Sequence, residues 1–311
     1  MTDLPSPANH ARSLLRQTPP RETIEWARRA VGGLARVLSI EPLYGGRSHA
    51  NHVIRLDTDQ GMREVVLRRW VRPDWFETDP EFSPAQEAAT YALLTSSAVP
   101  APRLLAADVA AAECDVPALL VTRAQGVRLT RPTDIGSFLT QLAGALPLVH
   151  GINPDGARRT LPPYRPYHEG VERHSPAWSR RQSAWRRAIE EVAAKRPDEP
   201  SAFIHRDYHP GNTLWDSGNL TAIVDWTTAS WGPPSVDVAH MRANLAMSFG
   251  ADTAEAFLDA YRAIVGASYV HDPYWDLRVA VDFLPDLPSD DRSSVELDRL
   301  DNFVAVSVAR L

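Results

Sequence analysis

The chain has 311 residues, of which 44% are hydrophobic and 23% are charged, and its formal net charge is −6. This composition is typical of a globular protein, and the negative charge argues against nucleic acid as a partner. The N-terminal segment has no basic start or apolar core, and no run is long enough to span a membrane. We therefore expect a cytoplasmic monomer or homodimer without a membrane partner. The single cysteine, Cys114, excludes an internal disulfide and a cysteine-built metal site.

The first part of the chain has the pattern of a small sheet with helices. A helix is predicted at 21–31, within a helical extension of residues 1–35. A second helix is predicted to run to about Ser96, because Ser83-Pro84 is a good helix start. Five β-prone runs accompany these helices, at 37–40, 52–56, 64–70, 103–106 and 117–121. They predict a five-stranded antiparallel sheet with one main helix packed on it.

The remainder of the chain is predicted to be mostly helical. Apolar residues recur at helical spacing, and Ser-Pro or Asp-x-x-Glu sequences mark some of the helix starts. The predicted helices lie near 135–150, 175–192, 236–248, 252–265 and 294–311. The predicted fold class is therefore α+β, with an N-terminal unit of residues 1–124 and a C-terminal unit of residues 125–311.

The stretch from Phe203 to Asp225 contains the most informative chemistry. Asp207 and Asn212 stand on either side of a Pro-Gly turn, and Asp225 follows a hairpin signal at 216–219. The hairpin is expected to bring Asp225 beside the loop that carries Asp207 and Asn212. One amide oxygen and one carboxylate suit Mg²⁺, which leaves Asp207 to take a proton from a hydroxyl. This is the arrangement that phosphoryl transfer needs.

Two other interpretations of this stretch are open. The first is an Asx-capped turn around the Pro-Gly, with Asp225 merely ending a strand. The second is a zinc hydrolase, because His205, Asp207 and His209 alternate along an extended segment and would point to the same side. The turn that follows at once argues against zinc, as does the lack of a second clustered His-Asp pair. If His205 is not a zinc ligand, it is expected to support the loop through hydrogen bonds to the backbone.

The same stretch carries the motifs of a known family. HRDYHPGN, followed by IVDW and GPPSVDVAH, resembles the aminoglycoside phosphotransferase and choline kinase superfamily, small-molecule kinases that share the protein-kinase fold. The resemblance covers most of the chain and implies a two-lobed fold with an N-terminal nucleotide-binding lobe. It makes Asp207 the catalytic base and Asn212 and Asp225 the Mg²⁺ ligands. Asp237 would either brace the catalytic loop or merely cap its helix.

The resemblance also assigns nucleotide contacts to the N-terminal lobe. In the family a strand lysine, held by a helix glutamate, contacts the α- and β-phosphates. Here the matching strand presents Arg68 and the helix presents Glu87, and a guanidinium suits both carboxylate and phosphate. The alternative is a surface Arg68 with Arg69 facing in. A glycine loop that contains Gly45, Gly46 and Ser48 is expected to cover the phosphates. A hinge that contains Thr122 and Ala124 is expected to pair with the purine through its backbone.

The acceptor is the least defined part of the prediction. Seven acidic residues between Asp282 and Asp301 form either a surface that attracts a polycation, such as an aminoglycoside, or a solvated loop and helix face. Five aromatic residues are candidates for an acceptor pocket: Trp178, Trp185, Trp231, Tyr274 and Trp275. The helical spacing of Trp178 and Trp185 favours a place in the core for these two. We predict an Mg²⁺-dependent phosphotransferase that uses ATP or GTP and a small hydroxyl-bearing acceptor. The alternatives are a kinase of an endogenous amino alcohol or sugar, and a kinase-like nucleotide-binding module without turnover.

Overall fold

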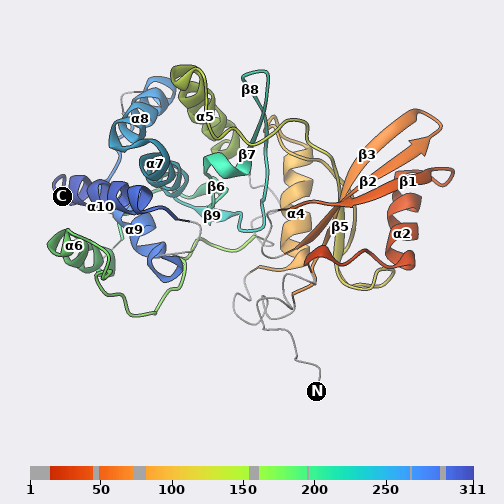
Figure 1. The fold of residues 1–311 in the computed structure, drawn as a ribbon, viewed down its shortest axis with the longest axis horizontal. Helices are drawn as coiled ribbons and strands as arrows, with labels where there is room; N and C mark the ends of the chain where they lie inside the picture. Colours follow the sequence, from red (N-terminus) through yellow and green to blue (C-terminus); the bar gives the residue numbers. More distant parts are fainter. Residues whose placement is uncertain are drawn as a thin grey trace. The chain divides into compact units, whose positions relative to one another are not determined.

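The computed structural model forms two compact units, Met1–Gln125 and Gly126–Leu311, which are described separately (Figure 1). The structure describes residues 15–44, 49–72, 82–153, 161–194, 196–266, 268–287 and 292–311. None of the helices in these ranges has the length and hydropathy of a bilayer span.

The first unit is built on one antiparallel sheet. Its strands are β1 (Arg36–Pro42), β2 (Ala50–Thr58), β3 (Gly61–Arg69), β4 (Leu104–Asp108) and β5 (Ala118–Thr122). Their order in the sheet is β1-β2-β3-β5-β4, and every neighbouring pair is antiparallel. Gly61 allows the tight β2–β3 hairpin because it adopts a φ of 101°. The predicted five-stranded antiparallel sheet is therefore confirmed.

Two helices, α2 (Arg21–Val31) and α4 (Pro84–Thr95), cover opposite faces of this sheet. Leu67 of β3 lies in a buried cluster with Trp26 of α2, whereas the next residue, Arg68, contacts Glu87 of α4. Successive side chains of a strand point to opposite faces, so the two helices must lie on different sides. The helical extension is thus part of this unit's core, in addition to the one helix that the sequence placed on the sheet.

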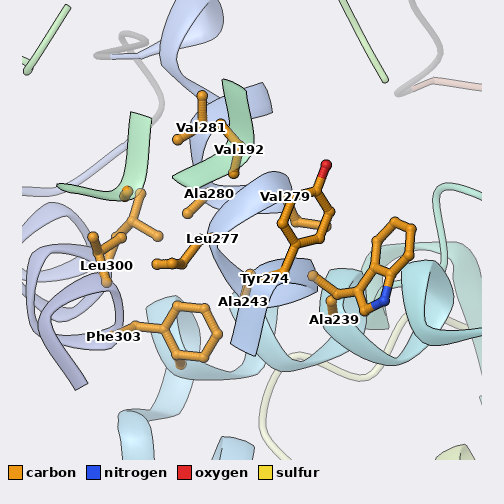
Figure 2. Close-up of a cluster of buried hydrophobic side chains, with 14 of the residues drawn as sticks. Val192, Ala239, Ala243, Tyr274, Leu277, Val279, Ala280, Val281, Leu300 and Phe303 are labelled. Carbon is orange, nitrogen blue, oxygen red and sulfur yellow. The ribbon is translucent and has the colours of Figure 1, made fainter. Parts of the chain in front are cut away.

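The second unit is mostly helical. Its helices are α5 (Ile135–His150), α6 (Gln182–Ala193), α7 (Ser235–Phe249), α8 (Ala251–Val265), α9 (Pro273–Asp282) and α10 (Ser294–Val308). Helix α7 is central, and 13 of its 15 residues are buried. Figure 2 shows Ala239 and Ala243 of α7 in one apolar cluster with Leu277 of α9 and Phe303 of α10. These small and large side chains pack α9 and α10 against α7.

One predicted helix in this unit begins later than expected, and one helix was not predicted. Helix α6 begins at Gln182, not near Ser175, because the Ser179 hydroxyl and the Arg180 N–H both donate to the buried Asp301 carboxylate and hold the preceding segment in a turn. Helix α9 was not predicted, although Asp272-Pro273 is a good helix start and the Asp272 carboxylate accepts from the Tyr274 N–H at 2.9 Å.

Two small sheets position the stretch singled out from the sequence. Strand β6 (Ala202–Ile204) pairs with β9 (Ser230–Gly232), and β7 (Thr213–Asp216) pairs with β8 (Asn219–Ile223), all antiparallel. Ser217 and Gly218 have φ values of 49° and 80°, as the turn of a two-residue hairpin requires. The segment between β6 and β7 contains Asp207 and ends in a short 3₁₀ helix, Pro210–Asn212.

Candidate active site

Asp207 is held by side chains from two elements. The Asn212 amide donates from Nδ2 to Asp207 Oδ2 at 2.9 Å and to the Asp207 carbonyl at 3.0 Å. On the other side, His240 Nε2 of α7 lies 3.4 Å from Oδ1. Burial alone would raise the pKa of Asp207, but the His209 and His240 imidazoles outweigh it and hold that pKa well below its usual range. Asp207 is therefore an ionised, oriented carboxylate that keeps 35% of its side-chain surface exposed.

The backbone before Asp207 is braced by Asp237, which is fully buried. The His205 N–H donates to Asp237 Oδ2 at 2.9 Å, and the Arg206 N–H donates to Oδ1 at 2.7 Å. Arg206 has a φ of 70°, a left-handed conformation that costs a non-glycine residue about 1–2 kcal/mol. The N-cap of α7 is Pro234, so the Asp237 carboxylate serves the loop and makes no cap hydrogen bond.

Both ring nitrogens of His205 have partners. Nδ1 accepts from the Asp207 N–H at 3.3 Å, and Nε2 lies 3.0 Å from the Val224 carbonyl, to which it donates. A ring committed in this way cannot ligate zinc without losing one of these contacts. Within the described ranges, no three His, Cys, Asp or Glu side chains are gathered to hold a metal. His205 links the loop to the segment that carries Asp225.

Asn212 and Asp225 lie on neighbouring segments. The Val224 N–H donates to the Asn212 carbonyl at 2.9 Å, which places the following residue, Asp225, beside this loop. Asp225 has a φ of 65°, and its Oδ1 accepts from the Thr227 hydroxyl at 3.2 Å. The hydrogen bonds of Asn212 to Asp207 use its NH₂ group, which leaves the amide oxygen as a possible ligand. An amide oxygen and a carboxylate form a hard donor set that fits Mg²⁺.

In the first unit, Arg68 and Glu87 form a buried ion pair. Arg68 donates from Nε and Nη2 to Glu87 Oε1 at 2.9 and 2.6 Å. Trp70 Nε1 donates to Oε2 at 2.8 Å, and His49 Nε2 lies 3.3 Å from the same oxygen. Burial alone would raise the pKa of Glu87, but Arg68 and His49 lower it to about 2. Arg68 and Arg69 are both buried, so the alternative of a surface Arg68 is wrong.

The other predicted nucleotide contacts belong to the glycine loop and the hinge. Gly45, Gly46 and Ser48 lie outside the described residues. Thr122 ends β5, and its N–H already donates to the Arg103 carbonyl at 2.9 Å. Ala124 lies just after β5 in a segment without regular secondary structure. Of the two predicted hinge residues, Thr122 therefore cannot offer its N–H to a purine without breaking a strand contact.

A small cavity of about 10 Å³, which is room for roughly one water molecule, lies beside His240 in the second unit. Its lining includes Tyr164, Tyr167, Arg206, His240, Asp282 and Phe283. The Arg206 guanidinium lies 4.2 Å from the centre of the Tyr167 ring. Burial raises the pKa of Asp282 to about 6, against the opposing effect of Arg278, which donates to it at 2.5 Å. The pocket thus combines aromatic walls with one buried cation and one buried acid.

Apart from Asp282, the sequence did not identify these pocket residues, because they come from four separate segments. Of the predicted aromatic wall, Trp185, Tyr274 and Trp275 lie in the hydrophobic core, and Trp178 packs against it. Trp231 is in β9 and is 9% exposed. The core position favoured for Trp185 is therefore confirmed, Trp275 is corrected from the pocket to the core, and Tyr274 is a core residue that also lines a second pocket.

Several acidic residues of the predicted surface are buried or form local hydrogen bonds. Asp282 and Asp301 are buried, and Asp301 accepts from the Trp185 Nε1–H at 2.8 Å as well as from the turn before α6. Glu296 forms a capping box with Ser293 at the start of α10. Asp286 and Asp298 are exposed, whereas Asp290 and Asp291 lie outside the described residues. The described acids therefore do not form the continuous surface that would attract a polycation.

Replacing Asp237 with asparagine is expected to destabilise the protein by about 2 kcal/mol and to lower kcat more than nucleotide affinity. An amide has one acceptor oxygen for the two N–H groups of His205 and Arg206, and hydrogen bonds to charged groups contribute about 1.5–3 kcal/mol. Urea unfolding and steady-state kinetics would measure both effects. Asp252→Asn, at an exposed position in α8, is the control and should change stability by less than about 0.5 kcal/mol. Equal effects of the two variants would contradict the bracing role.

Comparisons with known proteins agree with this arrangement. A structure from Ralstonia eutropha, proposed to be an aminoglycoside phosphotransferase, is similar with a TM-score of 0.61 at 15% identity over 94% of this chain and 99% of that one. A thermostable mutant of aminoglycoside phosphotransferase APH(4)-Ia, in a ternary complex with AMP-PNP and hygromycin B, gives 0.59 at 18% identity over 91% and 97%. Macrolide 2′-phosphotransferase type I gives 0.54 at 18% identity over 95% and 99%.

These similarities confirm the predicted α+β, protein-kinase-like fold class. No curated protein sequence matches the chain at a significant level. The model of the phosphotransferase enzyme family, however, matches residues 39–280, which is most of the chain. The chain therefore belongs to the phosphotransferase enzyme family, as its sequence motifs implied, and is a small-molecule phosphotransferase.

Proposed function

We propose that the protein transfers the γ-phosphoryl group of ATP, or of GTP, to a hydroxyl of a small molecule, with Asp207 as the catalytic base. The observation that carries this proposal is the ionised Asp207 carboxylate, oriented through Asn212 and His240 on a loop that Asp237 braces. As the acceptor oxygen bonds to the γ-phosphorus, its proton passes to Asp207. The bond between that phosphorus and the β,γ-bridging oxygen breaks, and the nucleoside diphosphate leaves.

Asn212 and Asp225 would hold Mg²⁺ through the amide oxygen and the carboxylate. When bound, Mg²⁺ would supply positive charge against the phosphate oxygens. The left-handed backbone conformation of Asp225 supports this assignment. Such a conformation costs free energy in a non-glycine residue, so it persists only where the surrounding structure imposes it, often at functional sites. The hydrogen bond of Thr227 orients the same carboxylate.

Residues 1–124 would bind the nucleotide and residues 125–311 would supply the base and the acceptor site. Arg68, held by Glu87, would contact the α- and β-phosphates, because a guanidinium suits both carboxylate and phosphate. Gly45, Gly46 and Ser48 would cover the phosphates through backbone N–H groups. Ala124 would offer its backbone to the purine, and Thr122 would take part only through its carbonyl.

The reacting hydroxyl of the acceptor would lie beside Asp207 and His240. The adjoining cavity is water-sized, so the body of a polyol, an amino alcohol or an antibiotic would lie outside it. One solved neighbour was crystallised with hygromycin B, which supports an aminoglycoside acceptor. The lack of a continuous acidic surface among the described residues removes the electrostatic argument for a polycation. It leaves a metabolite kinase as the second candidate function.

Metal dependence separates a binding site from an incidental pair of polar residues. With Mg²⁺, AMP-PNP at 100 times its Kd should stabilise the wild-type protein against thermal unfolding by about 2.7 kcal/mol, and without Mg²⁺ the same AMP-PNP concentration should stabilise it less. Asp225→Asn should lose most of this Mg²⁺-dependent increment and keep the metal-independent part. Asp216→Asn, in the exposed hairpin turn, should behave like wild type. An unchanged Mg²⁺ increment in Asp225→Asn would refute the assigned ligand.

A further inference from the structure

Helix α7 presents three polar residues toward the catalytic loop. Asp237, His240 and Asn244 are spaced three and four residues apart, so they lie on one face of the helix. Asp237 binds the loop backbone, and His240 Nε2 lies 3.4 Å from Asp207 Oδ1. His240 is 5% exposed, and its ring packs edge-on against Phe283 at 5.3 Å between centroids. This burial leaves the imidazole little freedom to rotate.

The contact with Asn244 determines which nitrogen of His240 carries the proton. Asn244 Nδ2 lies 2.9 Å from the His240 carbonyl oxygen, and two oxygens could not make this contact, so the amide nitrogen must face the carbonyl. The same NH₂ group lies 3.3 Å from His240 Nδ1. Nδ1 therefore accepts the hydrogen bond. In the neutral ring the proton must then be on Nε2, which faces Asp207.

We infer that His240 is a positioning residue for the catalytic base: Asn244 fixes its Nε2–H tautomer, and this N–H edge of the ring faces Asp207 Oδ1 at 3.4 Å. This inference depends on the proposed role of Asp207. Asn212 donates to Oδ2 and the His240 ring faces Oδ1, so each carboxylate oxygen is contacted by a different side chain. The plane of the carboxylate is thereby fixed, and its remaining lone pairs are directed at one place. A base held in this way meets the acceptor hydroxyl without first losing rotational freedom.

Two amide substitutions distinguish positioning from mere packing. The side-chain NH₂ of His240→Gln can reach the place of Nε2, whereas that of His240→Asn reaches only the place of Nδ1. Misplacing a reacting group by about 1 Å can cost on the order of 10²-fold in rate. We expect His240→Asn to lose about this factor in kcat with an unchanged nucleotide Kd, and His240→Gln to stay within severalfold of wild type. Equal kcat values for the two variants would overturn the inference.

The tautomer can be tested without turnover. A long-range ¹H–¹⁵N spectrum of the wild-type protein, with His240→Gln as the assignment reference, should show His240 protonated at Nε2 only. In Asn244→Asp a carboxylate faces Nδ1, so protonation at Nδ1 should appear and kcat should fall. A wild-type ring protonated at Nδ1 alone would overturn the inference. If wild type phosphorylates no acceptor, the proposed function fails and the positioning role fails with it, whereas the spectrum still decides which nitrogen of His240 carries the proton.

Discussion

Replacing Asp207 with asparagine is expected to lower kcat by a factor on the order of 10²–10⁴, the usual contribution of a general base, and to leave nucleotide binding unchanged. The amide cannot take the proton of the acceptor hydroxyl. Its NH₂ group would also face a donor, either the N–H of His240 or that of Asn212. Steady-state kinetics, with nucleotide affinity measured by calorimetry, would separate the loss of chemistry from any loss of binding.

The control for this variant is Asp216→Asn. Asp216 lies in the same region of the chain but is exposed in the turn between β7 and β8. The change of charge is the same, so any nonspecific electrostatic effect should appear in both variants. The control should retain wild-type kcat. An Asp207→Asn variant with wild-type kcat would exclude Asp207 as the base, even if the protein proved to be a phosphotransferase.

Replacing Glu87 with glutamine is expected to destabilise the first unit by about 3–5 kcal/mol and to weaken nucleotide binding. Removing one partner of a buried ion pair leaves the other charge uncompensated, and here Arg68 and His49 both lose the carboxylate that faces them. Arg68 would then lose the orientation that the proposed phosphate contact requires. Urea unfolding of wild type and variant, with and without AMP-PNP, would measure both effects.

A surface pair in the same unit provides the matched control for Glu87. Arg29 and Glu113 lie 2.7 Å apart, but their side chains are 51% and 56% exposed. Exposed pairs contribute only about 0–1 kcal/mol, so Glu113→Gln should change stability little and nucleotide affinity not at all. Similar losses in the two variants would show that the Arg68–Glu87 pair has no special role.

The ion pair of Glu87 also predicts how stability depends on pH. The pKa of Glu87 is lowered from 4.5 to about 2, so the folded protein favours the ionised form. Its contribution to stability is complete above about pH 4.5 and is lost as the pH falls toward 2. A shift of this size corresponds to about 3 kcal/mol. Glu87→Gln should remove this part of the acid dependence, whereas Glu113→Gln should retain it.

Local sequence signals predicted most of the fold and the centre of the site. The strands, the Ser83 start of α4 and the loop of Asp207 and Asn212 depend on residues that are close in sequence. The pairing of Arg68 with Glu87 followed from the family resemblance. Such features are visible in one chain because spacing alone determines which groups can meet.

The features that the sequence could not predict depend on contacts between distant segments. His240 stands a full helix turn beyond Asp237, and only the packing of α7 against the loop brings it to Asp207. Asp301 looks like a surface acid until the turn before α6 folds over it. The cavity beside His240 likewise needs Tyr167 and Phe283 to converge from different parts of the chain. Tertiary packing determined each of these placements.

The most direct test of the account is to incubate the protein with Mg²⁺, γ-phosphate-labelled ATP or GTP, and a panel of aminoglycosides, macrolides, amino alcohols and sugars. The account predicts that label passes to a hydroxyl of at least one acceptor, as a phosphomonoester seen by mass spectrometry and phosphorus NMR. It also predicts that transfer is lost with EDTA and in Asp207→Asn. Nucleotide binding without labelled product from any acceptor would contradict it and favour a kinase-like binding module.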